Sequence, residues 1–377
     1  MTLALVGARV FDGERMREDA AVVLEGRHIV AVRSEAELAP GIERQRVRGL
    51  LAPGFIDVQV NGGGGVLFNA DPSVEAIRAI GTAHRRFGTT SFLPTFITDK
   101  CEKMAAAIRA ARAALDADVP GVLGLHLEGP FLNPARKGVH DAGFMRVLGD
   151  DDIALLASLG RGRTLVTLAP EMVPMAAIAR LAAAGVIVAA GHTAASYAIV
   201  KEALVHGLTG FTHLFNAMPP LTGREPGPVG AALEDCAAWC GIIVDLHHVA
   251  PAVLKIALAA RGPDRMMLVT DAMPSVGSDL TSFDLLGQTV RRENGKLITA
   301  DGTLAGSDLD MASAVRNAVR HLGVRREDAL RMASLSPAGF LKFDHELGRI
   351  APGYRANLVL LDEGLKAVAT WIDGAAA

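Results

Sequence analysis

Several ionisable side chains stand at the ends of apolar, strand-like segments of the sequence. Four of them share this placement and could act together: Glu128, His192, His213 and Asp271. A carboxylate with two imidazoles is a known set of zinc ligands that leaves one coordination position open for water. A second carboxylate opposite such a metal could serve as a general base. The four residues therefore predict a catalytic metal site.

Each of these side chains also has a structural explanation when it is considered alone. A lone histidine in an apolar run is more often a satisfied interior residue than a ligand, and Glu128 or Asp271 could simply cap a turn. The set carries more information than its members, because four ionisable groups at the ends of core strands would be costly to bury without a metal or a function. We expect His126 to be structural, and Cys236 and Cys240 have no second pair that would complete a zinc site.

The segments that carry these residues belong to a repeating pattern of apolar runs and helical stretches. In residues 101–115, for example, Met104, Ile108, Ala111 and Leu115 fall at helical spacing. Eight near-continuous apolar runs, most followed by a helical stretch, predict a (β/α)8 TIM-like barrel, whose active site lies at the carboxyl ends of the strands. A doubly wound open sheet is the alternative, but no G-x-G-x-x-G follows any run. The runs are 55–60, 90–96, 122–128, 164–170, 186–191, 208–214, 240–246 and 265–271.

The two ends of the chain follow a different pattern. Short apolar runs separated by turn pairs such as Asp12-Gly13 occupy the N-terminal part, and ANLVLLD and VATWIDG return to that pattern near the C-terminus. We therefore expect a small β-sandwich domain built from residues 1–52 and 347–377. The barrel, as the metal-dependent catalytic domain, would occupy residues 53–346.

The composition argues against several classes of partner. Lys and Arg together number 38 against 41 Asp and Glu, a net charge of −3, so we expect neither a nucleic-acid nor a membrane surface. No apolar run reaches the ~18 residues that span a bilayer, and the N-terminus lacks the basic start of a secretory signal. Three cysteines cannot form a disulfide framework, which favours a cytoplasmic location.

Specific motifs resemble a known family. LAPGFIDVQVNG near the start of the predicted barrel and GRIAPGYRANLVLLD after it are similar to the amidohydrolase superfamily. Over essentially its whole length, the chain resembles the N-acetylglucosamine-6-phosphate deacetylase family within that superfamily. The motifs that carry this resemblance are HLEGPFL (126–132), KGVHDAG (137–143), AGHTAA (190–195), THLFNAMPPL (212–221), DLHHVAP (245–251), VTDAM (269–273) and GTLAGS (302–307).

The resemblance implies an enzyme that hydrolyses an amide. Its small-molecule substrate would be N-acetyl-D-glucosamine 6-phosphate, and its products D-glucosamine 6-phosphate and acetate. Carried over to this sequence, Glu128, His192 and His213 would hold one divalent metal ion. Asp271 would take a proton from the attacking water and deliver it to the departing amine, and His140 would bind the acetyl carbonyl and help to stabilise the oxyanion.

The resemblance also implies a phosphate site. Arg224 and His248 would bind the phosphate, and in this family such ligands are often supplied by the neighbouring subunit. The backbone at Asn216 and Ala217 would add hydrogen-bond donors. A homodimer with a phosphate site shared across its interface is therefore expected.

One departure concerns the number of metal ions. Superfamily members with two metals carry His-x-His at the end of the first barrel strand, where this chain has Gln59 and Asn61. Neutral amides are much weaker zinc ligands than imidazole. We therefore expect one metal per subunit, with Gln59 hydrogen-bonded to water where a second ion would lie. Zinc is the first choice, and Fe²⁺, Co²⁺ and Mn²⁺ are alternatives.

Two other functions stay open at this stage. The chain could deacetylate a related amino-sugar phosphate, such as N-acetylgalactosamine 6-phosphate, because the residues that read the configuration at carbon 4 cannot be placed from the sequence. It could also be a non-catalytic barrel that binds a sugar phosphate. The four retained residues, Glu128, His192, His213 and Asp271, argue against that second alternative.

Overall fold

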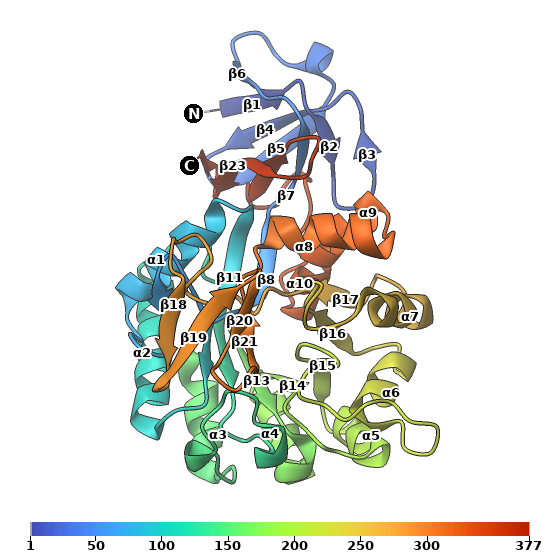
Figure 1. The fold of residues 1–377 in the computed structure, drawn as a ribbon. Helices are drawn as coiled ribbons and strands as arrows, with labels where there is room; N and C mark the ends of the chain where they lie inside the picture. Colours follow the sequence, from blue (N-terminus) through green and yellow to red (C-terminus); the bar gives the residue numbers. More distant parts are fainter. Residues whose placement is uncertain (1, 377) are drawn as a thin grey trace.

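The computed structural model describes residues 2–376, and its centre is an eight-stranded parallel sheet rolled into a barrel (Figure 1). A parallel bridge between Val60 and Ala272 joins the two ends of this sheet, so it closes on itself. The predicted (β/α)8 TIM-like barrel is confirmed. Its strands are β8 (Phe55–Val60), β11 (Thr89–Ile97), β12 (Gly124–Glu128), β13 (Arg163–Leu168), β14 (Ile187–Ala190), β15 (Leu208–Phe211), β16 (Trp239–Ile242) and β17 (Met266–Leu268).

Each of the eight predicted runs overlaps one barrel strand, but several strands end earlier than their runs. Strand β15 ends at Phe211 and β17 ends at Leu268. His213 and Asp271 therefore lie just beyond their strands, in the loops at the carboxyl end of the barrel. The apolar pattern continues past the last ladder hydrogen bond because residues of these loops, among them Leu214 and Val269, are themselves buried.

Helices pack around the outside of the barrel. In α2, the predicted Met104, Ile108, Ala111 and Leu115 are buried against the sheet, while the arginines of the helix face outward. No helix among residues 2–376 is both long enough and apolar enough to cross a membrane. The helices are α1 (Val74–Arg85), α2 (Cys101–Asp116), α3 (Asp150–Leu156), α4 (Met175–Ala183), α5 (Tyr197–Val205), α6 (Gly227–Glu234), α7 (Pro251–Arg261), α8 (Met311–Asn317), α9 (Arg326–Ala333) and α10 (Leu335–Phe340).

Both ends of the chain build sheets beside the barrel (Figure 1, top). Strand β7 pairs antiparallel with β22, from Leu50 against Leu361 to Pro53 against Leu358, and parallel with β2. This pairing supports the proposal that residues 1–52 and 347–377 form one unit. The strands of these sheets are β1 (Thr2–Val6), β2 (Arg9–Phe11), β3 (Met16–Arg17), β4 (Ala21–Glu25), β5 (His28–Arg33), β6 (Glu43–Arg46), β7 (Leu50–Pro53), β22 (Leu358–Leu361), β23 (Ala367–Ile372) and β24 (Ala375–Ala376).

A further sheet, which the sequence analysis did not anticipate, follows β17 in the chain. Its four antiparallel strands are β18 (Ser282–Leu285), β19 (Gln288–Glu293), β20 (Lys296–Ile298) and β21 (Leu304–Ser307). Their inward residues form a small core of their own with Met273 and Leu67, whereas most residues of β19 are exposed. We call residues 282–307 the flap. Its polar, alternating strands fit a sheet that is buried on one face only.

Asp57 joins the first barrel strand to the segment after the last one. Its side chain is fully buried and accepts a hydrogen bond from the Thr270 hydroxyl at 2.5 Å and from the backbone N–H of Gln59 at 3.2 Å. Burial raises the pKa of Asp57 to about 7, against the opposing effect of these hydrogen bonds. The backbone N–H of Asp271 also donates to the carbonyl of Gln59, at 3.0 Å. The barrel is thus closed at the point where Gln59 and Asp271 meet.

Candidate active site

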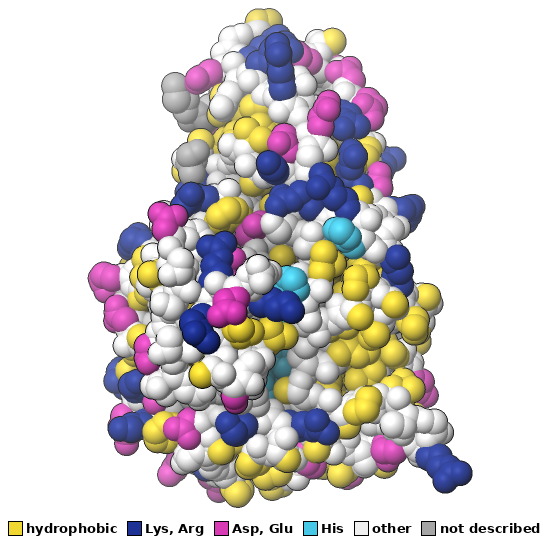
Figure 2. All heavy atoms as spheres, viewed as in Figure 1, with side chains coloured by type: hydrophobic (Ala, Val, Ile, Leu, Met, Phe, Trp, Pro, Cys, Tyr) yellow, Lys and Arg dark blue, Asp and Glu magenta, His cyan; other side chains and the backbone are white. Residues whose placement is uncertain are grey.

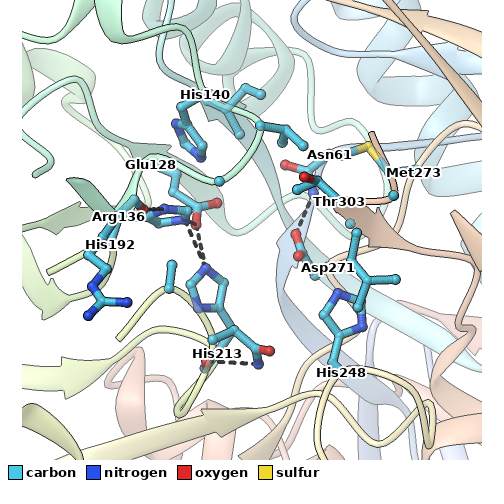
Figure 3. A pocket seen from close by; sticks show the side chains of 18 of the residues that line it. Asn61, Glu128, Arg136, His140, His192, His213, His248, Asp271, Met273 and Thr303 are labelled. Carbon is cyan, nitrogen blue, oxygen red and sulfur yellow. Dashed lines mark hydrogen bonds and ion pairs between the residues drawn. The ribbon is translucent and has the colours of Figure 1, made fainter. Parts of the chain in front are cut away.

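A cavity of about 540 Å³ opens at the carboxyl ends of the barrel strands (Figure 3). Most of the residues selected from the sequence line it, and they come from loops after six different strands. Gln59 lies beside the cavity and contacts its residues, whereas Arg224 is exposed on a surface loop and does not line it. The predicted residues in its lining are Asn61, Glu128, His140, His192, His213, Asn216, Ala217, His248 and Asp271.

Glu128, His192 and His213 converge on one point. The Oε1 atom of Glu128 lies 3.1 Å from Nε2 of His192 and 3.0 Å from Nε2 of His213, and the two Nε2 atoms are 3.1 Å apart. All three side chains are nearly fully buried. Three electron-rich atoms at such distances repel one another unless a cation lies among them. Their donor chemistry, one carboxylate oxygen and two imidazole nitrogens, therefore fits a divalent metal ion.

The second ring nitrogen of His192 fixes the direction of the first. Nδ1 donates to the backbone carbonyl of Arg136 at 2.8 Å, so the lone pair of a neutral ring is on Nε2 and faces Glu128. Such a backbone partner is typical of metal-binding histidines. Burial would raise the pKa of Glu128, but the neighbouring imidazole rings of His192 and His213 bring it well below its usual value. The carboxylate is therefore ionised, as a metal ligand must be.

A second combination of donors lies in the same place. One atom each from Glu128, His140 and His192 also fall within 4.8 Å of one another. The group with His213 is tighter, and His140 already uses Nδ1 in a hydrogen bond to Thr98 at 2.8 Å. The shorter distances therefore favour Glu128, His192 and His213 as the ligand set.

The backbone at three of these residues is strained. His192, His213 and Asp271 have positive φ angles of 48°, 31° and 53°, which non-glycine residues rarely adopt. Hydrogen bonds hold the strained segments, among them Asn133 N–H to the carbonyl of His192 and Ser307 N–H to the carbonyl of Asp271. Backbone strain of this kind is concentrated at functional sites, where it aims side chains that regular strands cannot aim.

Gln59 and Asn61 contact the two carboxylates of the site directly. Nε2 of Gln59 donates to Oε2 of Glu128 at 3.0 Å and to Oδ1 of Asp271 at 3.1 Å, and Nδ2 of Asn61 donates to the same Oδ1 at 2.6 Å. These two contacts use the amide nitrogen of Gln59, and its predicted hydrogen bond to water stays a prediction. The two amides therefore tie the candidate base to a candidate ligand, where other superfamily members place metal-binding histidines.

Asp271 has one oxygen committed and one available. Both amides donate to Oδ1, and none of the residues in 2–376 donates to Oδ2. Burial, followed by the negative charge of Glu128, raises the pKa of Asp271 to about 6. A carboxylate with a raised pKa and a free oxygen in a cavity is suited to accept and return a proton near neutral pH.

His140 faces His192 across the cavity, with ring centroids 4.4 Å apart. Burial, followed by the neighbouring His192, lowers the pKa of His140 well below its usual value, so the ring is neutral. The Thr98 hydroxyl lies 2.8 Å from Nδ1 and 3.4 Å from the carbonyl of Glu128; when it donates to Nδ1, the ring proton is on Nε2. A neutral ring in that tautomer offers one N–H donor to a ligand.

Asn216 and Ala217, which also line the cavity, differ in what they can offer. The backbone N–H of Asn216 already donates to the carbonyl of His213 at 3.0 Å, and so does its side chain at 3.1 Å. The backbone N–H of Ala217 has no partner among the described residues. Of the two expected backbone donors, Ala217 is therefore the free one.

Sequence reasoning missed several residues that line the cavity. Arg136 lies directly before the KGVH motif, and Met273 belongs to the VTDAM motif. Thr303 and Gly306 come from the flap, where Gly306 passes close to Met273 and the carbonyl of Asp271. The GTLAGS motif indicated that this segment matters, but it gave no indication of the four-stranded sheet to which the segment belongs.

Comparison with known proteins places the chain in a family. The amidohydrolase family model matches residues 50–376. The chain belongs to this family. An N-acetylgalactosamine-6-phosphate deacetylase from Shewanella sp. strain ANA-3 is 43% identical, over 98% of this chain and 94% of its own. An N-acetylglucosamine-6-phosphate deacetylase from Haemophilus influenzae is 36% identical, over 99% of both chains.

A solved structure of another amidohydrolase is also very similar. The crystal structure of N-acetylglucosamine-6-phosphate deacetylase from Pasteurella multocida has a TM-score of 0.97 and 34% identity, with 100% of both chains covered. This amidohydrolase therefore shares its complete fold with relatives that carry deacetylase names. Membership of the family and the buried Glu–His–His group together indicate a single divalent metal ion.

We expect one divalent ion per chain after purification without added metal, measured by elemental analysis. Glu128→Gln should lose most of it, because an amide oxygen is a far weaker ligand than a carboxylate. His345→Gln, at an exposed histidine, should retain it. Two fully occupied ions per chain would contradict a mononuclear site.

Proposed function

We propose that the chain hydrolyses the acetamide of N-acetyl-D-glucosamine 6-phosphate to D-glucosamine 6-phosphate and acetate. The observation that carries this proposal is the placement of a buried Glu–His–His cation site and a free Asp271 oxygen in one cavity. Hydrolysis of an amide needs both parts, because water is a poor nucleophile and an amine is a poor leaving group at neutral pH. The deacetylase names of the relatives support the substrate.

We propose zinc as the ion, with iron, cobalt and manganese as alternatives that use the same donors. Two imidazoles and one carboxylate form a catalytic ligand set for zinc, although imidazole also suits the other metals. When bound, a divalent ion supplies Lewis acidity, which lowers the pKa of water to about 7 and polarises a carbonyl.

The residues around the ligands divide the remaining work. Asp271 takes a proton through Oδ2 from the attacking water and later gives it to the nitrogen of the leaving amine, a contribution of about 10²- to 10⁴-fold. His140 donates from Nε2 to the oxygen of the acetyl group, where a positioned donor contributes roughly 3 kcal/mol as negative charge develops. Gln59 and Asn61 keep Asp271 in the orientation that exposes Oδ2.

The phosphate would lie at the end of the cavity that Ala217 and His248 line. Ala217 offers a free backbone N–H, and His248 offers a ring nitrogen. Arg224 would complete this site from the partner subunit, since it lies outside the cavity of its own chain. An arginine fork is well suited to phosphate oxygens.

A second candidate is the deacetylation of N-acetylgalactosamine 6-phosphate. The relative with 43% identity carries that name, and so does a relative from Escherichia coli O157:H7 with 36% identity. The two substrates differ only in the configuration at carbon 4 of the sugar. The metal site and the phosphate site described above would serve either of them.

A cytoplasmic location is part of the same proposal. The three cysteines are free, and two of them, Cys101 and Cys236, are exposed. Exposed free thiols are suited to a reducing compartment.

An acetate-release assay with both epimers tests the proposed function. The purified protein should release acetate from each phosphorylated substrate that it accepts, with higher kcat/KM for the gluco epimer, and chelation of the metal should abolish release. A higher kcat/KM for the galacto epimer would select the second candidate. Absence of release from both, in protein that carries its metal, would favour the non-catalytic alternative.

Asp271→Asn should keep substrate binding and lose turnover. Asparagine has the shape of aspartate but cannot hold the transferred proton, so kcat should fall by about 10²- to 10⁴-fold with little change in the dissociation constant. Asp116→Asn, at the exposed end of α2, is the control and should match the wild type. Wild-type turnover by Asp271→Asn would refute the assignment of the base.

The surface near Arg224 supports a homodimer. Helix α7 exposes Val253 and Ile256, at 38% and 66%, and Leu221 on the neighbouring loop is 52% exposed. Figure 2 shows apolar side chains gathered on the side of the molecule where α6 and α7 lie. An apolar patch with an exposed arginine beside it is a suitable subunit interface.

Mixing two inactive variants tests the shared site. Arg224→Ala should bind phosphate poorly, and Asp271→Asn should lack the base. If Arg224 acts in the partner's cavity, mixed dimers should recover activity, because each contains one cavity with an intact Asp271 and an intact Arg224. Lack of recovery in dimers shown by mass spectrometry to be mixed would place Arg224 outside the shared site.

A further inference from the structure

The loop after β16 contains a buried pair, Asp245 and His248, whose side chains are 8% and 7% exposed. Oδ2 of Asp245 lies 2.6 Å from Nδ1 of His248. Oδ1 of the same carboxylate accepts the backbone N–H groups of His247 and His248, both at 2.9 Å. One carboxylate thus holds both the ring of His248 and the backbone from which that ring projects.

This arrangement determines what His248 presents to the cavity. Nδ1 must carry a proton to donate to Asp245, so Nε2 is the nitrogen left for the cavity that His248 lines (Figure 3). In a neutral ring of this tautomer Nε2 can only accept, and it would repel an anionic oxygen. In the imidazolium form Nε2 donates, and the adjacent carboxylate stabilises that positive charge.

The charges around the pair agree with an ionised Asp245. Burial alone would raise its pKa, but the hydrogen bond and charge of His248, together with the backbone donors, lower the pKa to about 2. Asp271 also faces His248, whose charge lowers the pKa of Asp271. His248 therefore lies between two carboxylates, one of which bonds directly to its ring.

We propose that Asp245 is a positioning residue that holds His248 as an imidazolium donor for the phosphate of the substrate. The inference rests on the proposed function for the identity of the ligand. It traces the ability of His248 to bind an anion to Asp245, a residue that does not itself line the cavity. Such partners of ligand-binding histidines typically contribute 10- to 100-fold to affinity at metal sites, and we expect about the same here.

Asp235 provides a control that separates the proposed role of Asp245 from a purely structural role in its turn. Asp235, in the preceding loop, accepts the backbone N–H groups of Ala237 and Ala238 at 2.9 and 2.8 Å in the same kind of turn. Its side chain has no histidine partner among the described residues and does not line the cavity. Asp235→Asn is therefore a matched control for loss of charge in a turn.

Asp245→Asn should raise KM for the phosphorylated substrate and the inhibition constant of inorganic phosphate about 10- to 100-fold, with kcat nearly unchanged. Its amide can still accept the two backbone N–H groups, but it cannot neutralise an imidazolium. The kcat/KM for N-acetylglucosamine, which lacks the phosphate, should not change. Asp235→Asn should match the wild type in all of these measurements.

A double variant separates positioning from general damage. If Asp245 acts through His248, adding Asp245→Asn to His248→Gln should weaken phosphate binding no further than His248→Gln alone. Should Asp245→Asn not fold, as judged by its melting curve, Asp245→Ser keeps an oxygen for the backbone groups and takes its place. Unchanged phosphate affinity, or an equal loss with both sugars, would overturn the proposal.

The outcome remains interpretable if the proposed function fails. Binding of inorganic phosphate to the wild type and to Asp245→Asn, measured by calorimetry, does not require turnover. A wild type that releases no acetate would refute the deacetylase proposal alone. A wild type that binds phosphate no better than Asp245→Asn would refute the role of Asp245 alone.

Discussion

Three electron-rich atoms that face one another inside a buried cavity are the interaction on which the site depends. Glu128 contributes one oxygen and His192 and His213 one nitrogen each, and all three distances are close to 3 Å. Such atoms repel when none of them carries a proton, so the arrangement favours a cation among them. The fold maintains it with strained backbone at both histidines and with the carbonyl of Arg136, which orients His192.

Closure of the barrel places the candidate base opposite these ligands. Asp57 bonds to Thr270, and the backbone of Asp271 bonds to that of Gln59, where the first and last strands meet. The side chains of Gln59 and Asn61 then hold one oxygen of Asp271 and leave the other free. A second metal ion would hold the carboxylate of Asp271 by coordination. In this chain the two neutral amides hold it by hydrogen bonds.

The cavity lining also contains groups suited to an anion. Asp245 holds the ring of His248, and the backbone N–H of Ala217 has no partner among residues 2–376. The flap brings Thr303 and Gly306 to the rim, and the apolar surface of α7 lies on the same side as the loop of Arg224. The residues proposed for reaction chemistry and those proposed for anion recognition therefore line one cavity.

Local patterns of the sequence were sufficient for the barrel and for the list of candidate residues. Eight apolar runs placed eight strands, the spacing of Met104, Ile108, Ala111 and Leu115 placed α2, and strand ends singled out Glu128, His192, His213 and Asp271. These features depend on neighbours in the chain. Only the tertiary structure decided which atoms meet. Gln59 contacts Glu128 and Asp271, which lie 69 and 212 residues away in the sequence, and the flap contributes to the lining of the cavity. Contacts over such separations arise when the barrel closes, and no local pattern encodes them.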